Sequence, residues 1–200
     1  MKRGERRRSV RPRRQLAERI LVVTEGTRTE RLYVEGLGRY LRSRDTTAIV
    51  KTVPVGKDPL KVVHKCIETR EEATRRGKGY DHCVCLVDVD DHHTLRVAAQ
   101  LADEEGILLL ISNLKFEVWL RWHTENKRSP ENSKQLDRIV TDLGLVEGKI
   151  LSPSFPYDGV HGACVTARAA DPEMQPGVPG ANPSSHMPIL VDLMQGKAPR

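Results

Sequence analysis

The chain has 200 residues, 38% of them hydrophobic, and a formal net charge of +6. This length fits a single domain with a small appendage. No apolar run reaches the roughly 18 residues needed to cross a membrane. The apolar run nearest the start, 20–23, is too short for the core of a signal peptide. We therefore expect a cytoplasmic protein without a membrane partner.

The positive charge is concentrated at the start of the chain. Residues 1–14 contain eight of the 33 Lys and Arg residues and one of the 27 acidic residues. The other 186 residues carry 25 basic and 26 acidic side chains, a net charge of −1. We expect residues 1–18 to form a basic flexible arm, which either binds polyanions or keeps the chain soluble.

From residue 19 onward, apolar runs alternate with helical patterns. The expected strands are 19–24, 46–55, 82–90 and 107–111. One expected helix starts at Pro59 behind the N-cap Asp58 and is ended by Gly77 and Gly79. The other expected helices are 27–44, 94–105, 114–125, 134–143, 160–170 and 189–194. This alternation predicts an α/β fold with a mostly parallel central sheet of about four strands and helices on both faces.

The expected organisation has a core and an extension. Residues 19–126 contain the four strands and form the core. Residues 127–200 become rich in Pro and Gly and form a helical and loop extension that packs on it. Phe116 and Trp119 are predicted to be core residues. The four cysteines fit no zinc spacing, and we interpret Cys83 and Cys85, which share a strand face, as small core residues.

Carboxylates follow two of the predicted strands. Glu25 ends the first strand, and Asp88 and Asp90 end the third, where they share one face. The carboxyl ends of parallel strands meet at one edge, which in open α/β sheets binds ligands. We therefore expect these three carboxylates to converge. They would repel one another strongly without a cation, and oxygen ligands suit a hard divalent ion, so the sequence predicts a Mg²⁺ or Mn²⁺ site.

Several neighbouring polar residues each have two open roles. Asp91 and His92 either position a water molecule or a second metal ion, or cap the following helix. Asn113, at the end of the fourth strand, either contacts a phosphate or caps a helix. Glu117 either reaches the metal site or is a first-turn acid stabilised by the helix dipole. His123 points to a different side of the same helix and is a weaker candidate.

Two basic residues lie just beyond strands at the predicted ligand edge. Arg28 follows the first strand and Lys57 follows the second. Both are candidates for binding the phosphate backbone of a nucleic acid, as an alternative to being ordinary surface cations.

The acidic strand ends resemble a known domain. Residues 24–26 (TEG), followed by residues 88–90 (DVD), are similar to the Toprim domain of topoisomerases, primases and OLD-type nucleases. Five blocks resemble RloB-like proteins, an antiphage-associated Toprim group, over most of residues 19–195. These blocks are ILVVTEGTRTERLYVEGL, DPLKVV, YDHCVCLVDVDDH, LLISNLKFEVWLRWH and NPSSHMPILVDLM. The chain departs from the pattern at Leu114, where the family has Pro.

The resemblance implies a Toprim-like catalytic core and a metal-dependent endonuclease. Its substrate would be RNA, with tRNA as one option, or DNA, cleaved in phage defence by abortive infection. The resemblance implies that Glu25, Asp88 and Asp90 form the catalytic and metal-binding set. Glu25 would then act as general acid or base, and the two Asp would bind Mg²⁺. An AAA-type ATPase is an implied partner, because some members of the group are encoded beside one.

Two other functions stay open at this point. Residues 86–90 (LVDVD) also fit the first motif of a haloacid-dehalogenase-like phosphotransferase, with Asp88 as nucleophile. Against this, two strands precede the motif, and His92 stands where Thr or Val is expected. The other alternative is a non-catalytic module that binds nucleic acid or an ATPase partner through the basic arm and the late helices.

Overall fold

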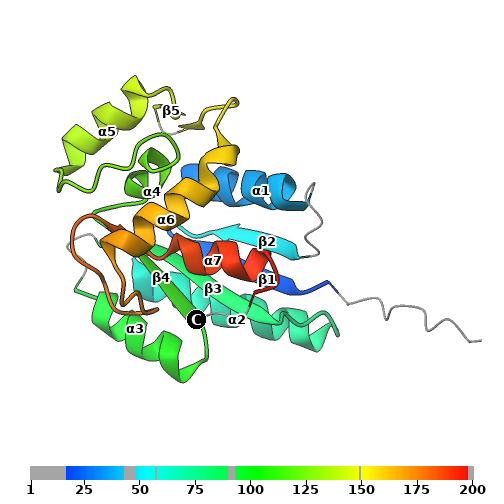
Figure 1. Cartoon of the computed structure of the whole chain (residues 1–200). Helices are drawn as coiled ribbons and strands as arrows, with labels where there is room; N and C mark the ends of the chain where they lie inside the picture. Colours follow the sequence, from blue (N-terminus) through cyan, green and yellow to red (C-terminus); the bar gives the residue numbers. More distant parts are fainter. Residues whose placement is uncertain (1–16, 43–47, 57, 90–92, 149, 198–200) are drawn as a thin grey trace, which may run out of the picture.

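The computed structural model describes residues 17–42, 48–56, 58–89, 93–148 and 150–197 (Figure 1). Its centre is a five-stranded sheet in the order β2-β1-β3-β4-β7. The strands are β1 (Arg19–Thr24), β2 (Ile49–Pro54), β3 (His82–Asp88), β4 (Leu108–Asn113) and β7 (Ser184–Ser185). The first four strands pair in parallel, and β7 pairs with β4 in antiparallel orientation. The predicted α/β class with a mostly parallel sheet is confirmed.

Helices cover both faces of this sheet. The helices are α1 (Thr29–Arg42), α2 (Pro59–Arg75), α3 (Leu95–Glu104), α4 (Glu117–Arg121), α5 (Ser133–Asp142), α6 (Val160–Ala170) and α7 (Met187–Met194). A short hairpin of β5 (Val146–Glu147) and β6 (Ile150–Leu151) follows α5, and a 3₁₀ turn (Tyr157–Gly159) precedes α6. Within the described part of the chain, none of these helices combines the length and apolarity of a membrane span.

The middle residues of the central strands β1, β3 and β4 are apolar because both faces of these strands are buried. On β1, Leu21 and Val23 face a core layer formed with α2 and α3. Ile20 and Val22 face a second, larger layer that α1 and α4 to α7 cover. That layer also contains residues from beyond position 126, such as Leu190. The C-terminal segment therefore shares a core with the first part of the chain.

One helix is much shorter than its sequence pattern predicts. The predicted helix 114–125 is only α4, five residues long. Arg121 is buried and pairs with Glu125 (2.8 Å) and Glu131 (3.5 Å). The Trp122 Nε1–H donates to the Lys127 carbonyl at 2.8 Å. These contacts hold the chain after α4 in a loop, which a helical periodicity cannot reveal.

Three short strands were not predicted. β5, β6 and β7 have two residues each, too few to show an alternating pattern. β7 adds a fifth strand, and its Ser185 Oγ lies 2.9 Å from the Ser112 Oγ on β4. The predicted strand 107–111 correspondingly extends to Asn113 in β4.

An aromatic cluster joins α1 to the C-terminal segment. Tyr33 is fully buried, and four rings lie edge-on or tilted around it within 5.4–5.6 Å of its centroid. These rings belong to Phe116, His123, Phe155 and Tyr157. Trp119 adds a fifth ring at 6.2 Å and is itself fully buried, so the prediction that Phe116 and Trp119 are core residues is confirmed.

Candidate active site

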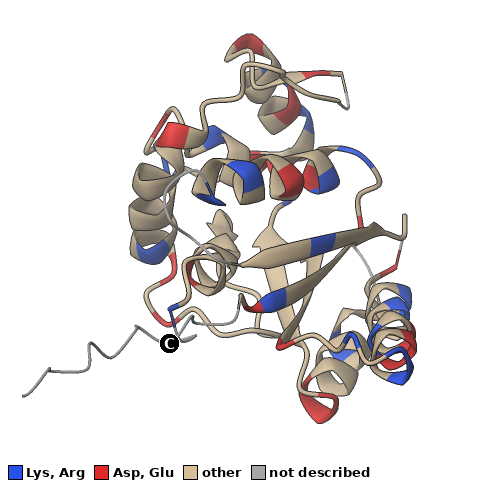
Figure 2. Ribbon diagram, turned by 90° about the vertical axis from the view of Figure 1, so that its right-hand side faces the viewer, with Lys and Arg blue, Asp and Glu red and all other residues tan. Residues whose placement is uncertain are grey.

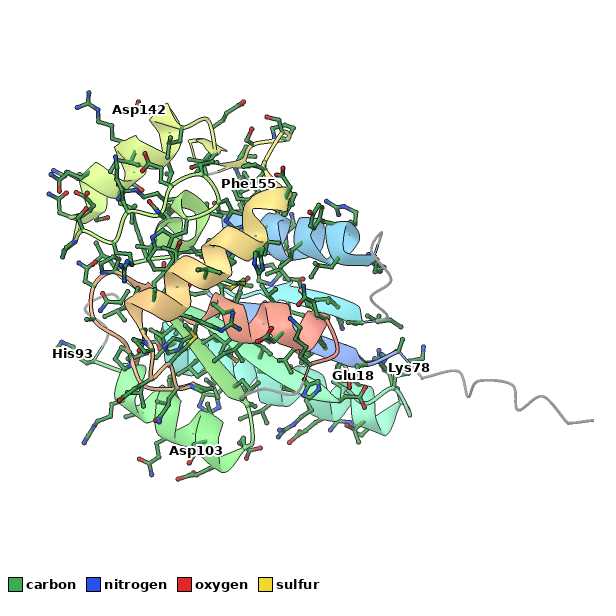
Figure 3. All side chains as sticks on the ribbon, in the orientation of Figure 1. Glu18, Lys78, His93, Asp103, Asp142 and Phe155 are labelled. Atoms are coloured by element: carbon green, nitrogen blue, oxygen red, sulfur yellow. The ribbon has the colours of Figure 1, made fainter. Side chains whose placement is uncertain are left out.

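The direction in which the chain adds strands to the sheet reverses between β1 and β3. β1 lies between β2 and β3, so the chain first adds a strand on one side of β1 and later continues on the other. Ligands of open α/β sheets bind at such a reversal, outside the carboxyl ends of the strands. Glu25 directly follows β1, and Asp88 is the last residue of β3. In Figure 3, His93 marks this end of the sheet and Lys78 the opposite end.

Hydrogen bonds hold Glu25 against β3. The backbone N–H of Glu25 donates to the Leu86 carbonyl at 3.0 Å. The Glu25 Oε2 accepts the backbone N–H of Asp88 at 3.2 Å. The Thr24 hydroxyl donates to the Gly26 carbonyl at 2.8 Å and shapes the turn that follows. The structure therefore brings Glu25 and Asp88 together.

The structure adds a carboxylate that sequence analysis did not single out. Glu30, in the first turn of α1, folds back over Gly26, where an added Cβ would lie 1.7–2.0 Å from its carboxylate atoms. Burial, together with the nearby carboxylates of Glu117 and Glu25, raises the pKa of Glu30 to about 7. The sequence feature that could have identified Glu30 as a site residue is its position in the first turn of the helix that follows the acidic end of β1.

Glu117 belongs to the same cluster of acids. It is the first residue of α4, and its carboxylate is among the charges that raise the pKa of Glu30. Both of its open roles agree with this position, because Glu117 lies in the first turn of α4 and close to Glu30. Glu25, Glu30, Asp88 and Glu117, here called the acidic cluster, come from four different elements that meet at one edge.

A small cavity of about 10 Å³ adjoins the acidic cluster. This is room for roughly one water molecule. Glu30, Asp88, Ser112 and His186 form its polar lining; the apolar lining is Leu86, Val87, Leu110, Phe116 and Met187. The cavity therefore brings polar groups of the C-terminal segment next to the strand ends.

His186 attaches the C-terminal segment to the edge of the sheet. The imidazole is fully buried, and its Nδ1 accepts the Ile111 backbone N–H at 3.3 Å. Its Nε2 lies 3.5 Å from the Asp171 carboxylate. Burial lowers the pKa of His186 and Asp171 opposes this effect, so the ring is held mainly as a neutral acceptor. No pattern in the local sequence pointed to this residue.

The described acids suit a hard cation but do not form a complete site. Among the residues described, no group of three or more His, Cys, Asp and Glu is arranged to hold a metal ion. The donors present are carboxylates, which Mg²⁺ and Mn²⁺ prefer. Burial raises the pKa of Glu30, and repulsion by the carboxylates of Glu117 and Glu25 adds to this effect. A divalent cation would relieve this repulsion, so the donor set fits the predicted metal.

Four predicted site residues lie outside the described residues. These are Lys57, Asp90, Asp91 and His92. Their assigned roles therefore stay predictions, as does that of the basic arm, of which only Ala17 and Glu18 are described.

Asn113 and Arg28, two further predicted site residues, lie in different environments. The Asn113 side-chain amide donates to the Gly180 carbonyl at 2.8 Å, so it anchors the loop before β7. The residue that directly precedes α4 is Phe116, which means that Asn113 does not occupy the cap position of that helix. Arg28 is exposed in the turn between β1 and α1, close in sequence to Glu25.

A hydrogen bond links the loops that follow β2 and β3. The Asp58 Oδ1 accepts the Leu60 backbone N–H at 2.9 Å, which confirms the predicted N-cap of α2. The same oxygen accepts the Thr94 hydroxyl, also at 2.9 Å, at the start of α3. Asp58 thereby ties together two helix starts at the ligand edge, and these bonds lower the pKa of its carboxyl group.

Other chemically reactive side chains lie in the core. His123 is buried, with its Nδ1 3.1 Å from the Trp119 carbonyl and its Nε2 3.0 Å from the Tyr33 hydroxyl. All four cysteines are buried free thiols, and the prediction that Cys83 and Cys85 are core residues is confirmed. Contact with Cys66 and burial hold the pKa of the Cys83 thiol well above its ordinary value. These groups are structural in this arrangement.

Comparison with known proteins gives one positive result. No curated protein and no solved structure matches the chain. The family model described as RloB-like protein matches residues 20–194, which include every described acid of the acidic cluster. The match runs from β1 through the last residue of α7. The chain therefore belongs to the RloB-like protein family.

Proposed function

We propose that the protein is a metal-dependent phosphodiesterase of the Toprim type, an endonuclease that cleaves RNA or DNA in phage defence. The observation that carries this proposal is the contact between Glu25 and the backbone of Asp88 at the reversal point of the sheet. Glu30 and Glu117 increase the negative charge at the same place. A cluster of carboxylates at a ligand crevice is suited to cation-assisted phosphoryl chemistry.

The proposed roles rest on the resemblance to the Toprim domain and on the contact between Glu25 and Asp88. Asp88 and Asp90 bind the metal ion, with Glu25 beside them. When bound, Mg²⁺ supplies positive charge for the non-bridging oxygens of the scissile phosphate. Glu25 transfers a proton to or from the reacting oxygen as general acid or base. The hydrogen bond from the Asp88 backbone orients the Glu25 carboxylate for this role.

Glu30 can change its protonation state near neutral pH. A carboxyl group with a pKa of about 7 is present in both forms at that pH. This property suits proton transfer, and it also makes the charge of the cluster sensitive to cation binding. We therefore include Glu30 in the proposed active site, with Glu117 as its neighbour.

A cleavage assay tests this proposal. Purified protein is incubated with end-labelled tRNA, single-stranded DNA and supercoiled plasmid, in Mg²⁺, Mn²⁺ or EDTA. The variants are Glu25→Gln, Asp88→Asn and Asp90→Asn. Glu147→Gln is the matched control, because Glu147 is an exposed acid on the β5–β6 hairpin. We expect metal-dependent cleavage by the wild type and the control, and a loss of at least roughly 100-fold in the three variants.

A cell-based assay covers the case of a restrained enzyme. Nucleic acid is the proposed substrate, and an AAA-type ATPase is the proposed partner that controls cleavage. If purified protein cleaves nothing, expression of the wild type should still be toxic and that of Glu25→Gln harmless. Equal harmlessness of both, together with binding of nucleic acid, would identify a non-catalytic module. Metal-dependent release of phosphate from a small phosphomonoester, without nucleic acid cleavage, would instead identify a phosphotransferase.

A further inference from the structure

One face of α1 carries a row of arginines. At roughly 100° per residue, Arg28, Arg31, Glu35, Arg39 and Arg42 fall within an arc of about 80°. Arg28, Arg39 and Arg42 are exposed, and the Arg31 side chain is 37% exposed. Arg28 precedes the helix, but its carbonyl oxygen accepts the Leu32 backbone N–H. The helical hydrogen-bond pattern therefore already includes Arg28. We call these five residues the arginine face.

The charge of the arginine face is mostly uncompensated. Among the described residues, its ion pair is the one between Arg31 and Glu35, at 3.1 Å. The helix α2 on the other face of the sheet differs, because most basic side chains along it and at its C-cap pair with an acid. The pairs are Lys65–Glu68, Arg70–Glu105, Arg75–Glu71 and Arg76–Glu72. Basic positions appear in blue along the helices in Figure 2.

The arginine face starts at the acidic cluster and leads away from it. Arg28 is three residues beyond Glu25, and Arg42 ends α1 about 21 Å further along at 1.5 Å per residue. A groove of about 160 Å³ lies beside the far end, between α1 and the edge strand β2. Arg39 and Arg42 border this groove. A ligand on this face would therefore extend from the proposed active site along the helix.

The chemistry of this face favours the backbone of a double helix. One strand of a duplex presents a phosphate about every 3.4 Å along its axis, so about 21 Å corresponds to about six base pairs. Binding of single strands depends on aromatic platforms that stack bases. The arginine face contains no aromatic residue. The nearby Tyr40 ring instead stacks on Tyr157, with a centroid distance of 6.1 Å.

We propose that the arginine face is the track on which the phosphate backbone of a double-helical nucleic acid lies while one of its phosphodiesters occupies the acidic cluster. This inference rests on the proposed nuclease function, and it specifies the substrate as a duplex DNA or a base-paired RNA stem. Arg39 and Arg42 also lie in the last turn of α1, where they interact favourably with the helix dipole. The test therefore needs a readout that a purely structural role would not change.

The salt dependence of binding supplies this readout. The full-length chain, in EDTA to prevent cleavage, is titrated against a fluorescent DNA duplex of about 20 bp, an RNA hairpin and the corresponding single strands. The test variant is Arg39→Gln/Arg42→Gln, and Arg75→Gln/Arg76→Gln is the control with the same change in net charge. Thermal melting of each protein verifies that it is folded. The N-terminal arm is present in every sample, so its contribution cancels in the comparison.

We expect the test variant to bind duplexes at least roughly tenfold more weakly at about 0.1 M salt. The slope of log K against log [salt] should become shallower by about 1.8, because each phosphate contact contributes about 0.9. The control should match the wild type in both measurements. A comparison of binding to the DNA duplex with binding to the RNA hairpin shows which of the two nucleic acids the arginine face binds.

Equal slopes for the wild type and the test variant would overturn the arginine face as a track. Loss of single-strand binding without loss of duplex binding would overturn the choice of a duplex. Either result leaves the cleavage assay with Glu25→Gln unaffected, so the two proposals fail separately. Conversely, a shallower slope in a protein that neither cleaves nucleic acid nor is toxic when expressed would support the track and contradict the nuclease.

Discussion

At the scale of single residues, the acidic cluster concentrates negative charge at a partly buried position. The Glu25 carboxylate accepts a backbone N–H from Asp88, and the partly buried Glu30 lies near the carboxylates of Glu25 and Glu117. Removal of a carboxylate from water disfavours its charged form, and neighbouring negative charge does so further. The charged form of a carboxylate is therefore destabilised at this site, which is a common property of binding and catalytic sites.

Glu30 should make the protein less stable at alkaline pH. Its pKa is raised from 4.5 to about 7 in the folded state, so its contribution is favourable below pH 4.5 and is lost as the pH rises through 7. We expect Glu30→Gln to abolish this loss. The quantity to compare is the unfolding free energy of the variant minus that of the wild type, in metal-free buffer. This difference should be about 1–3 kcal/mol larger at about pH 8 than at about pH 4.5.

Urea denaturation in EDTA at the two pH values measures this difference. The control is Glu147→Gln, in which the difference between the two pH values should equal that of the wild type. Millimolar Mg²⁺ should raise the stability of the wild type at the higher pH more than that of Glu30→Gln. An identical pH dependence of the wild type and Glu30→Gln would contradict the placement of Glu30 in the cluster.

His123 should make the protein less stable at acidic pH. Burial lowers its pKa from 6.5 to about 4, so the favourable contribution of the neutral ring is present above pH 6.5 and is lost as the pH falls through 4. In His123→Gln, the fall in unfolding free energy between about pH 7 and pH 4 should be smaller by up to about 3 kcal/mol. Urea titrations at these pH values provide the test. His161→Gln, at an exposed position of α6, should behave as the wild type.

At the scale of elements, one helix start is explained by local residues and another also involves contact with a distant part of the chain. The start of α2 follows from the local residues Asp58 and Pro59, and its N-cap was predictable. The start of α6 agrees with its predicted position, but it also involves a close approach that the sequence did not reveal. An added Cβ on Gly159, the residue before α6, would lie 2.2 Å from the His123 carbonyl oxygen. This contact brings the end of α4 and the start of α6 together without any signal in the local sequence.

A matched pair of glycine substitutions tests this account. Gly159→Ala should destabilise the protein by about 2 kcal/mol or more, because the clash involves backbone atoms that cannot easily move. Gly162 lies inside α6 with no atom within 4 Å of an added Cβ. Gly162→Ala should therefore stabilise the protein by about 0.5–1 kcal/mol through its helix preference. Denaturant unfolding measures both, and equal effects of the two substitutions would contradict the proposed contact.

At the scale of the whole molecule, the sheet separates two core layers of unequal size. The smaller layer is formed by α2 and α3, and the larger one combines α1 and α4 with the C-terminal helices. Leu190 of α7 is fully buried in the larger layer, near residues of the first half of the chain. Because this layer is shared, residues 127–200 should unfold together with the rest of the described chain.

Leu190→Ala tests this cooperativity. The substitution should cost about 2–5 kcal/mol of unfolding free energy. It should shift the transitions seen by tryptophan fluorescence and by far-UV circular dichroism to the same extent, since both tryptophans lie in the larger layer. Val178→Ala, at a side chain that is 57% exposed, should change stability by less than about 0.5 kcal/mol. Two separate transitions in the variant would show that α7 unfolds independently.

The sequence alone was sufficient for the alternating α/β order, the parallel sheet and the acidic strand ends. These features depend on periodicity, on local capping and on the rule that parallel strands end at one edge. The bounds of β1 and α6 agree with their predicted ranges. Glu25 and Asp88 could be paired in advance because each directly ends or follows a strong apolar strand.

Only the tertiary structure determined which other groups join them. Glu30 reaches the cluster because the absence of a side chain at Gly26 leaves room for its carboxylate. His186 reaches it because β7 pairs with the edge of β4 through only two residues. Likewise, α4 is short because buried Arg121 forms ion pairs with acidic residues of the loop that follows this helix. Each of these outcomes depends on contacts between segments that are separate in the chain, which no local pattern encodes.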